Sequence, residues 1–224
     1  VNNIVLGGMG GSGIGAQFAK TFFYEVANKS IEVVSDYHLP NYIDKNTLLI
    51  LASYSGNTEE TLSMLEEGMQ AGCKIICITS GGTLEETALE NNMKIYKIPT
   101  GYQPRMAFGF SCSINLLILA EALNLSGVMA ELKNAISIYD DKDELKSQAS
   151  QLNLFFDKTK KNKFVIFTDR NASPAAIRLA QQIQENAKCE AYVNILPENN
   201  HNALESYYSS VPSNIILLNG NSND

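Results

Sequence analysis

Hydroxyl side chains are concentrated in residues 53–61, whose sequence is SYSGNTEET. The preceding residues 47–52 are almost wholly apolar, which predicts a strand buried on both faces of a parallel sheet, and the following residues have helical apolar spacing. Backbone N–H groups at a helix start, beside Ser and Thr hydroxyls and a glycine that permits close approach, can bind a phosphate without a metal. An ordinary helix cap needs fewer hydroxyls, so these residues form a candidate phosphate-binding loop.

A second glycine-rich segment, GMGGSG at residues 8–13, fits the GxGxxG pattern between a predicted strand and a predicted helix. With Asp36 near the end of the next strand, it matches the dinucleotide-binding fingerprint. Ser12 argues against that interpretation, because it adds a hydroxyl where a pyrophosphate site needs only backbone. Loops that follow parallel strands meet in one crevice, so we expect this turn to share a monophosphate with residues 53–61. A nucleotide-dependent oxidoreductase is the lower-ranked alternative.

Three further residues could contribute charge or proton transfer. Arg105 lies between a proline and an apolar helix start, where it could stabilise an enediolate or a phosphate or extend from a helix end as a structural residue. Glu185, taken alone, has the ordinary interpretation of an exposed helical carboxylate. His201 lies in an Asn-rich turn before a predicted helix, where an imidazole can contact a ligand. His38, in a turn before Leu39, is predicted to have a packing role.

These segments must be positioned by alternating strands and helices. Strands are predicted at residues 1–7, 31–35, 47–52, 74–79 and 93–98, and later at 163–168, 191–196 and 214–218. Helices separate them, and a long helical region with breaks near residues 126–127 and 140–141 connects the two groups. This alternation predicts an α/β protein with doubly wound parallel sheets and right-handed crossovers.

The composition and the net charge limit the classes of partner and compartment that we expect for this protein. The 224 residues are 45% hydrophobic and 18% charged with a net charge of -7, which predicts a globular protein without a nucleic-acid partner. The longest apolar stretch, near residues 114–120, is too short to span a membrane, and no secretory signal is expected. Four cysteines without CxxC spacing are predicted to be buried free thiols in a reducing, cytoplasmic compartment. Two histidines without HExxH give little support for a metal site.

Together the segments resemble the bifunctional phosphoglucose/phosphomannose isomerase family of the sugar isomerase (SIS) domain superfamily. The serine-rich loop alone would indicate only a SIS domain, and the other segments narrow the resemblance to this family. The likeness is carried by GGMGGSG at 7–13, SYSGNTEET at 53–61, PRMAFG at 104–109, ENAK at 185–188 and PENNHN at 197–202.

The resemblance implies two SIS domains, each a doubly wound, flavodoxin-like parallel sheet flanked by helices. Residues 1–125 would form the first domain with the phosphate loop, residues 126–160 a helical linker, and residues 161–224 a second domain that is incomplete at its C-terminal end. The implied reaction interconverts glucose 6-phosphate or mannose 6-phosphate with fructose 6-phosphate through a cis-enediol, without a metal or a cofactor.

The resemblance also implies roles position by position. Glu185 would move the proton between C1 and C2, Arg105 would stabilise the enediolate, and His201 would assist ring opening from the other subunit of an obligate homodimer. The phosphate would be held by Ser12, Ser53, Ser55 and Thr58, with the backbone of Gly10, Gly11 and Gly56.

The sequence departs from the family pattern in the second half. Residues 168–173 are TDRNAS where the family usually has a glycine-containing turn, and residues 178–180 are RLA where Arg-Trp-Lys is common. Family members also continue past the equivalent of Asp224, with a C-terminal helix that contributes to the active site. We therefore expect either a truncated isomerase or a protein that has lost part of its pocket. The second case would be a non-catalytic sugar-phosphate-binding protein.

Overall fold

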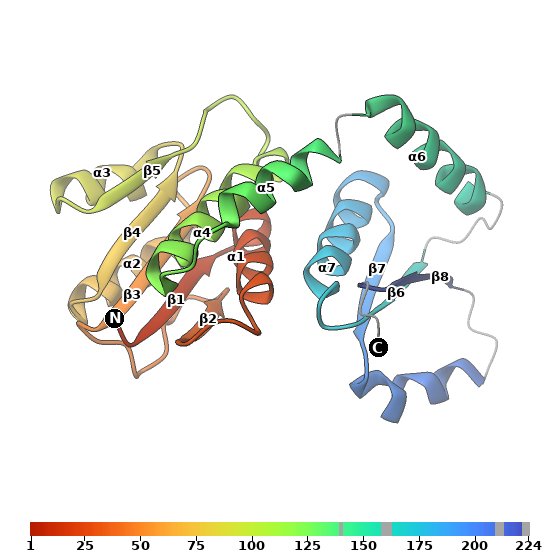
Figure 1. The fold of residues 1–224 in the computed structure, drawn as a ribbon, viewed down its shortest axis with the longest axis horizontal. Helices are drawn as coiled ribbons and strands as arrows, with labels where there is room; N and C mark the ends of the chain where they lie inside the picture. Colours follow the sequence, from red (N-terminus) through yellow and green to blue (C-terminus); the bar gives the residue numbers. More distant parts are fainter. Residues whose placement is uncertain (139–140, 158–162, 209–212, 221–224) are drawn as a thin grey trace. The chain divides into compact units, whose positions relative to one another are not determined.

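A computed structural model describes residues 1–138, 141–157, 163–208 and 213–220 (Figure 1). The chain divides into two compact units, Val1–Ala130 and Glu131–Asp224. The sequence-based division into residues 1–125, a linker and residues 161–224 stays a prediction.

The first unit is built on a five-stranded parallel sheet with the strand order β2-β1-β3-β4-β5. Its strands are β1 (Asn3–Gly8), β2 (Ser30–Val34), β3 (Thr47–Ser53), β4 (Lys74–Thr79) and β5 (Lys94–Lys97). The central strand β3 is buried at every position, because both faces of the sheet are covered by helices. β1 and β3 are neighbours in register, with Gly8 opposite Ala52.

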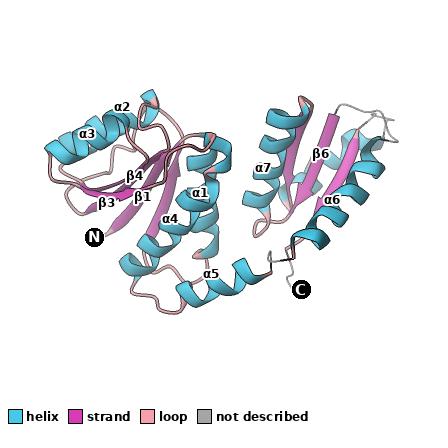
Figure 2. Ribbon diagram, turned by 90° about the horizontal axis from the view of Figure 1, so that it is seen from above, coloured by secondary structure: helices cyan, strands magenta, loops and turns pink. Residues whose placement is uncertain are grey.

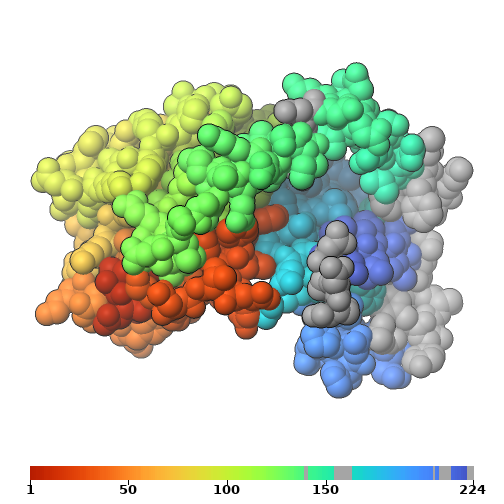
Figure 3. Space-filling model, viewed as in Figure 1, coloured from red at the N-terminus to blue at the C-terminus, as the bar shows by residue number. Residues whose placement is uncertain are grey.

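Helices cover the two faces of this sheet in pairs. In Figure 2, α1 (Gly10–Phe22) and α4 (Phe108–Leu123) lie on one side, and α2 (Glu59–Gln70) and α3 (Gly82–Glu90) lie on the other. α1 and α4 also pack against each other (Figure 3). Side chains along β1 alternate between the two faces of the sheet, as expected of a strand. Val5 belongs to the core under α2 and α3, whereas its two neighbours in the sequence do not. The fully buried members of this core include Leu49, Leu51, Met64, Leu84 and Ala88.

The second unit contains a three-stranded parallel sheet with the order β7-β6-β8. Its elements are α6 (Lys142–Asp157), β6 (Lys163–Thr168), α7 (Ser173–Gln182), a π turn (Ile183–Ala187), β7 (Glu190–Ile195) and β8 (Asn214–Leu218). α7 packs on Phe164 and Ile166 of β6, which are 8% and 0% exposed. On the opposite face, the edge strand β8 leaves Ile215 and Leu217 more than half exposed. α5 (Val128–Ser137) crosses the boundary between the units.

The structure confirms the predicted α/β class, the parallel sheets and the three separate helices of the region between them. Two smaller predictions were wrong. His38 does not pack, because its side chain is 80% exposed, and the neighbouring Leu39 occupies the core instead. All four cysteines are free thiols, but only Cys77 is fully buried.

The described residues contain neither a membrane-spanning helix nor a metal-binding cluster. No helix among them is both long and apolar enough to cross a lipid bilayer. The same residues hold no group of three or more His, Cys, Asp or Glu side chains arranged to bind a metal ion.

Candidate functional site

The strand order of the first unit fixes where a ligand can bind. The chain leaves β1 toward β2 on one side and later returns to β3 on the other, so the order reverses between β1 and β3. In open α/β sheets, ligands bind in the crevice outside the carboxyl ends of the strands at this reversal. The two glycine-containing and hydroxyl-rich turns of the sequence start at that position, one from β1 and one from β3.

The loop between β3 and α2 is organised by its own hydroxyls. Ser53 is only 2% exposed, and its Oγ lies 2.8 Å from Thr58 Oγ1 and accepts the Gly56 N–H at 3.1 Å. Ser55 Oγ accepts the Asn57 N–H at 3.2 Å while the side chain stays exposed. Thr58 is the N-cap of α2, whose first N–H groups have no partner within the helix. Hydroxyls and helix N–H groups therefore meet in one turn.

A third loop, between β4 and α3, fixes this turn from outside. Gly56 O accepts the Leu84 N–H at 2.9 Å, and Asn57 Oδ1 accepts both the N–H and the hydroxyl of Thr83 at 3.0 and 3.1 Å. The loop at residues 80–83 is not among the functional segments predicted from the sequence. A serine directly after another strand of the same sheet was the available signal, because the carboxyl ends of parallel strands share one edge.

Glycine is required where these two loops touch. Gly56 has φ +71°, and a Cβ added there would lie 1.7 Å from Gly81 O. Gly82 has φ +72°, and its added Cβ would lie 2.4 Å from Ser55 O. Such backbone approach together with left-handed φ is available to glycine alone at acceptable cost. The loops are consequently in direct backbone contact, which holds the hydroxyl-rich turn in one shape.

The turn between β1 and α1 supplies the neighbouring side of the crevice. α1 begins at Gly10, so Ser12 and Gly11 belong to its first turn. The N–H groups of Ser12 and Gly13 donate to Met9 O at 3.0 and 3.1 Å. The structure thus brings the predicted backbone contacts Gly10 and Gly11, with the Ser12 hydroxyl, to a second helix N-terminus beside the first.

Arg105 lies in a single 3-10 turn, Pro104–Met106, before α4. A Cβ added at Gly11 would lie 3.3 Å from Pro104 O, so this turn is next to the start of α1. Arg105 is half-buried. The first unit therefore brings Arg105 to the same side as the predicted phosphate residues.

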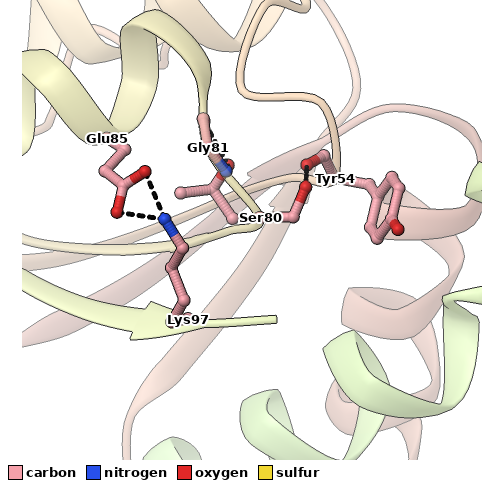
Figure 4. Close-up of polar contacts among 6 residues, drawn as sticks. Tyr54, Ser80, Gly81, Glu85 and Lys97 are labelled. Atoms are coloured by element: carbon pink, nitrogen blue, oxygen red, sulfur yellow. Dashed lines mark hydrogen bonds and ion pairs between the residues drawn. The ribbon is translucent and has the colours of Figure 1, made fainter. Parts of the chain in front are cut away.

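Charged side chains lie at the starts of α2 and α3. Lys97, the last residue of β5, pairs with Glu85 in the first turn of α3 (Figure 4). Glu60 and Glu59 in the first turn of α2 lie close enough to Tyr37 to raise the pKa of its hydroxyl, with Glu60 contributing most and burial adding to it. The carboxylates of both helices are thus placed in first turns, where the helix dipole favours negative charge.

Glu185 lies in the π turn that ends α7 in the second unit. Its side chain is exposed, and its carbonyl accepts a hydrogen bond from Lys188 Nζ at 2.7 Å. Burial lowers the pKa of Arg178, and the Glu185 charge opposes that shift, so the guanidinium and the carboxylate are close. A depression of about 460 Å³ opens beside this turn. Its lining residues are Gln184, Lys188, Cys189, Glu190, Ala191 and Tyr192.

His201 lies at the other end of β7. It closes the 3-10 turn Glu198–His201 and is exposed, and Asn199 Nδ2 ties this turn to Ile195 O at 2.7 Å. The six residues of β7 span about 16 Å at the rise of a parallel strand. Glu185 and His201 are therefore at opposite edges of one sheet, and the second unit does not bring them together.

Comparisons with known proteins support the family resemblance that the sequence motifs indicate. The SIS domain profile matches residues 1–114, and the profile of the bacterial phospho-glucose isomerase C-terminal SIS domain matches residues 146–224. Bifunctional phosphoglucose/phosphomannose isomerases from Aquifex aeolicus and Caldicellulosiruptor bescii are 40% and 35% identical over 89% and 91% of this chain. A D-glucosamine-6-phosphate 4-epimerase from Sulfolobus acidocaldarius is 32% identical over 94% of the chain and is matched over 66% of its own length. The chain spans about three fifths of the length of the two isomerases.

Solved structures show the same fold at low sequence identity. The C-terminal domain of glucosamine-fructose-6-phosphate aminotransferase from Francisella tularensis has a TM-score of 0.75 at 19% identity, over 97% of this chain and 64% of that one. Tagatose-6-phosphate ketose/aldose isomerase from Escherichia coli has a TM-score of 0.70 at 18% identity, over 96% and 62%. With the profiles and the relatives above, the chain belongs to the SIS-domain family and, within it, to the bifunctional phosphoglucose/phosphomannose isomerase family.

Proposed function

We propose that this protein is an aldose–ketose isomerase that interconverts glucose 6-phosphate or mannose 6-phosphate with fructose 6-phosphate. The observation that carries the proposal is the convergence, at the β1/β3 reversal, of the Ser53–Thr58 turn, the Ser12 turn and the Arg105 turn. Two helix N-termini and their hydroxyls can hold a phosphate dianion, and Arg105 adds fixed positive charge next to it. The names of the relatives support the choice of substrate.

The reaction needs a base, a stabilising cation and an acid. In our proposal Glu185 takes the proton from C2 of the open-chain aldose and returns it to C1, while the proton of the O2 hydroxyl moves to O1. The numbers of atoms and electrons are therefore unchanged. Arg105 stabilises the oxyanion of the cis-enediolate between the two transfers. His201 gives a proton to the ring oxygen during ring opening. No step requires a metal or a cofactor.

The distance along β7 supports a homodimer in which the site is shared. C1 and the ring oxygen are bonded to each other in the cyclic sugar, so the base at C1/C2 and the acid at the ring oxygen must act within a few ångströms. Glu185 and His201 of one copy are separated by the full strand. We therefore propose that His201 of a second copy serves the Glu185 of the first.

A coupled assay with glucose 6-phosphate and mannose 6-phosphate tests the activity. We expect turnover of both sugars, unchanged after treatment with EDTA. Glucosamine 6-phosphate should be included, because one relative carries the name of an epimerase for that sugar. Turnover of glucosamine 6-phosphate without isomerisation of either hexose phosphate would contradict the proposal.

Mixing two inactive variants tests the shared site. Glu185→Gln and His201→Asn should each be inactive alone. After the subunits are exchanged, half of the dimers are mixed and each contains one intact site, so about a quarter of the wild-type activity should return. Absence of recovery in a preparation with proven subunit exchange would place both residues of a site in one copy.

The exposure of Glu185 and His201 favours one alternative function. A sugar-phosphate-binding protein without turnover needs only the first unit, where the phosphate residues and Arg105 gather. In that case fructose 6-phosphate should bind with the same affinity to the parent and to Glu185→Gln, and neither should isomerise it.

A further inference from the structure

Tyr54 lies in the middle of the hydroxyl-rich turn and is held at both of its ends. Its carbonyl accepts the Ser80 hydroxyl at 2.6 Å and the Ser80 N–H at 3.1 Å (Figure 4). Its own hydroxyl donates to Pro99 O at 3.2 Å and accepts the Tyr102 N–H at 2.8 Å. One side chain therefore connects the turn after β3 to the segment that follows β5, 45 and 48 residues later in the chain.

The segment that receives this contact leads directly to Arg105. Tyr102 packs edge-on against Phe110 with ring centroids 5.5 Å apart. One residue further on, Gln103 O accepts the Met106 N–H at 2.8 Å and begins the turn that contains Arg105. The hydrogen bond at Tyr102 therefore holds the chain three residues before Arg105.

Little else packs around this segment. Residues 99–104 are all exposed, and a Cβ added at Gly101, which has φ +92°, would meet nothing within 4 Å. A short exposed segment of this kind samples several conformations unless specific contacts hold it. The two hydrogen bonds of the Tyr54 hydroxyl supply such contacts, and a tyrosine transmits position well because its ring has only two rotatable bonds.

We propose that Tyr54 is a positioning residue that sets Arg105 relative to the bound phosphate. The inference rests on the proposed function and adds a residue to it. Tyr54 lies between Ser53 and Ser55, so binding of the phosphate fixes the tyrosine, and the tyrosine fixes the start of the Arg105 turn. Because catalytic groups lose much of their effect when displaced by about 1 Å, this link makes the cation effective only at the correct distance from the substrate.

The first test requires no ligand. Tyr54→Phe keeps the ring and removes the hydroxyl, so the Tyr102 amide loses its acceptor. We expect hydrogen exchange of that amide to accelerate at least tenfold, with unchanged exchange in β3. Tyr42→Phe is the matched control, because its hydroxyl bonds Glu32 away from the site. Unchanged exchange at Tyr102 would overturn the inference whatever the protein catalyses.

The second test separates positioning from phosphate binding. Inorganic phosphate reports on the turns alone, whereas arabinonate 5-phosphate, whose carboxylate resembles the enediolate, also requires Arg105. Tyr54→Phe should change phosphate affinity less than twofold and weaken arabinonate 5-phosphate about tenfold, the value of one well-placed hydrogen bond. In an Arg105→Ala background, the tyrosine change should have no further effect.

The outcomes distinguish the inference from the proposed function. Equal weakening of both ligands, or full additivity with Arg105→Ala, would make Tyr54 an ordinary structural residue while the isomerase assignment stands. Wild-type protein that bound neither ligand would overturn the proposed function and, with it, this inference.

Discussion

The two units differ in how firmly their proposed functional residues are held by neighbouring groups. In the first unit, the loop between β3 and α2 is held by its own hydrogen bonds, such as those of Ser53, and is bonded through Asn57 to the loop between β4 and α3. In the second unit, Glu185 and His201 are exposed residues at opposite ends of β7. The first unit therefore has its proposed binding groups in place before any ligand arrives, whereas in our proposal the second unit needs a second copy of the chain to complete a site.

The difference follows from what each task requires. Binding a dianion needs several donors converging on one position, which adjacent parallel strands provide within one sheet. Proton transfer needs a base and an acid at neighbouring atoms, and residues at opposite sheet edges can meet this need only across an interface. The comparison predicts that changes of Glu185 and His201 in the second unit affect turnover, whereas changes in the phosphate-binding turns of the first unit affect affinity and stability.

Glu185→Gln gives the largest expected effect. The amide cannot take up the C2 proton, so kcat should fall by about a thousandfold, within the range for removal of a general base. The dissociation constant for inorganic phosphate should be unchanged. Glu190→Gln, an exposed carboxylate at the start of β7, is the control and should retain turnover. A Glu185→Gln protein with parental kcat in the coupled assay would exclude Glu185 as the base.

Gly56→Ala tests the contact between loops in the first unit. The added methyl meets Gly81 O at 1.7 Å at a φ of +71°, so the free energy of unfolding should fall by more than about 2 kcal/mol. Gly72→Ala is matched in φ, at +71°, but its methyl would meet nothing within 4 Å. It should cost only the backbone term of about 1 kcal/mol. Equal urea midpoints for the two variants would show that the loops separate easily.

Much of the fold was predictable because local signals agreed with the final structure. The bounds of β4, β6 and β8 match the predicted ranges residue for residue, since each is a short apolar run between polar turns. The hydroxyls of residues 53–61 likewise identified their own loop. In each case the residues whose pattern predicts the strand or loop are the same residues that make up that strand or loop.

Contacts between distant residues were not predictable in this way. Tyr54 resembles an ordinary tyrosine in the sequence, and its partners Pro99 and Tyr102 have no feature that indicates them. His38 was assigned to packing because it precedes Leu39, yet it reaches Glu67 on α2. Which residues pair across loops depends on loop path and sheet register, and a single sequence carries only a weak trace of either.

Ser53→Ala tests the first unit at the level of one hydroxyl. Its Oγ orders the Gly56 N–H and the Thr58 hydroxyl in a buried position, so its removal should weaken phosphate binding about tenfold. The value of kcat at saturating substrate should change less than KM. Ser150→Ala, which removes an exposed hydroxyl bonded to Lys146 O on α6, should change neither quantity. A large loss in kcat with constant KM would mean that Ser53 acts in the chemistry.

The contact between His38 and Glu67 gives the smallest expected effect and a defined pH dependence. Its atoms Nδ1 and Oε1 are 2.7 Å apart. The hydrogen bond to Glu67, followed by the charge of Glu67 and a smaller effect of Asp36, raises the pKa of His38 above 6.5. The hydrogen bonds from His38 and from the Leu39 N–H lower the pKa of Glu67 below 4.5.

The sign of the pH effect follows from these two shifts. The His38 contribution to stability is fully present below pH 6.5 and is lost as the pH rises through the raised pKa, and the Glu67 contribution is present above pH 4.5 and is lost as the pH falls through the lowered one. A glutamine at position 67 can still accept the Leu39 N–H, so Glu67→Gln removes mainly the charge. The difference in unfolding free energy between this variant and the parent should therefore be largest between pH 4.5 and pH 6.5. The difference should shrink at about pH 8.5 and in high salt, because the pair is exposed. A difference that is constant from pH 5 to about 8.5 in urea titrations would show that the contact is an uncharged hydrogen bond.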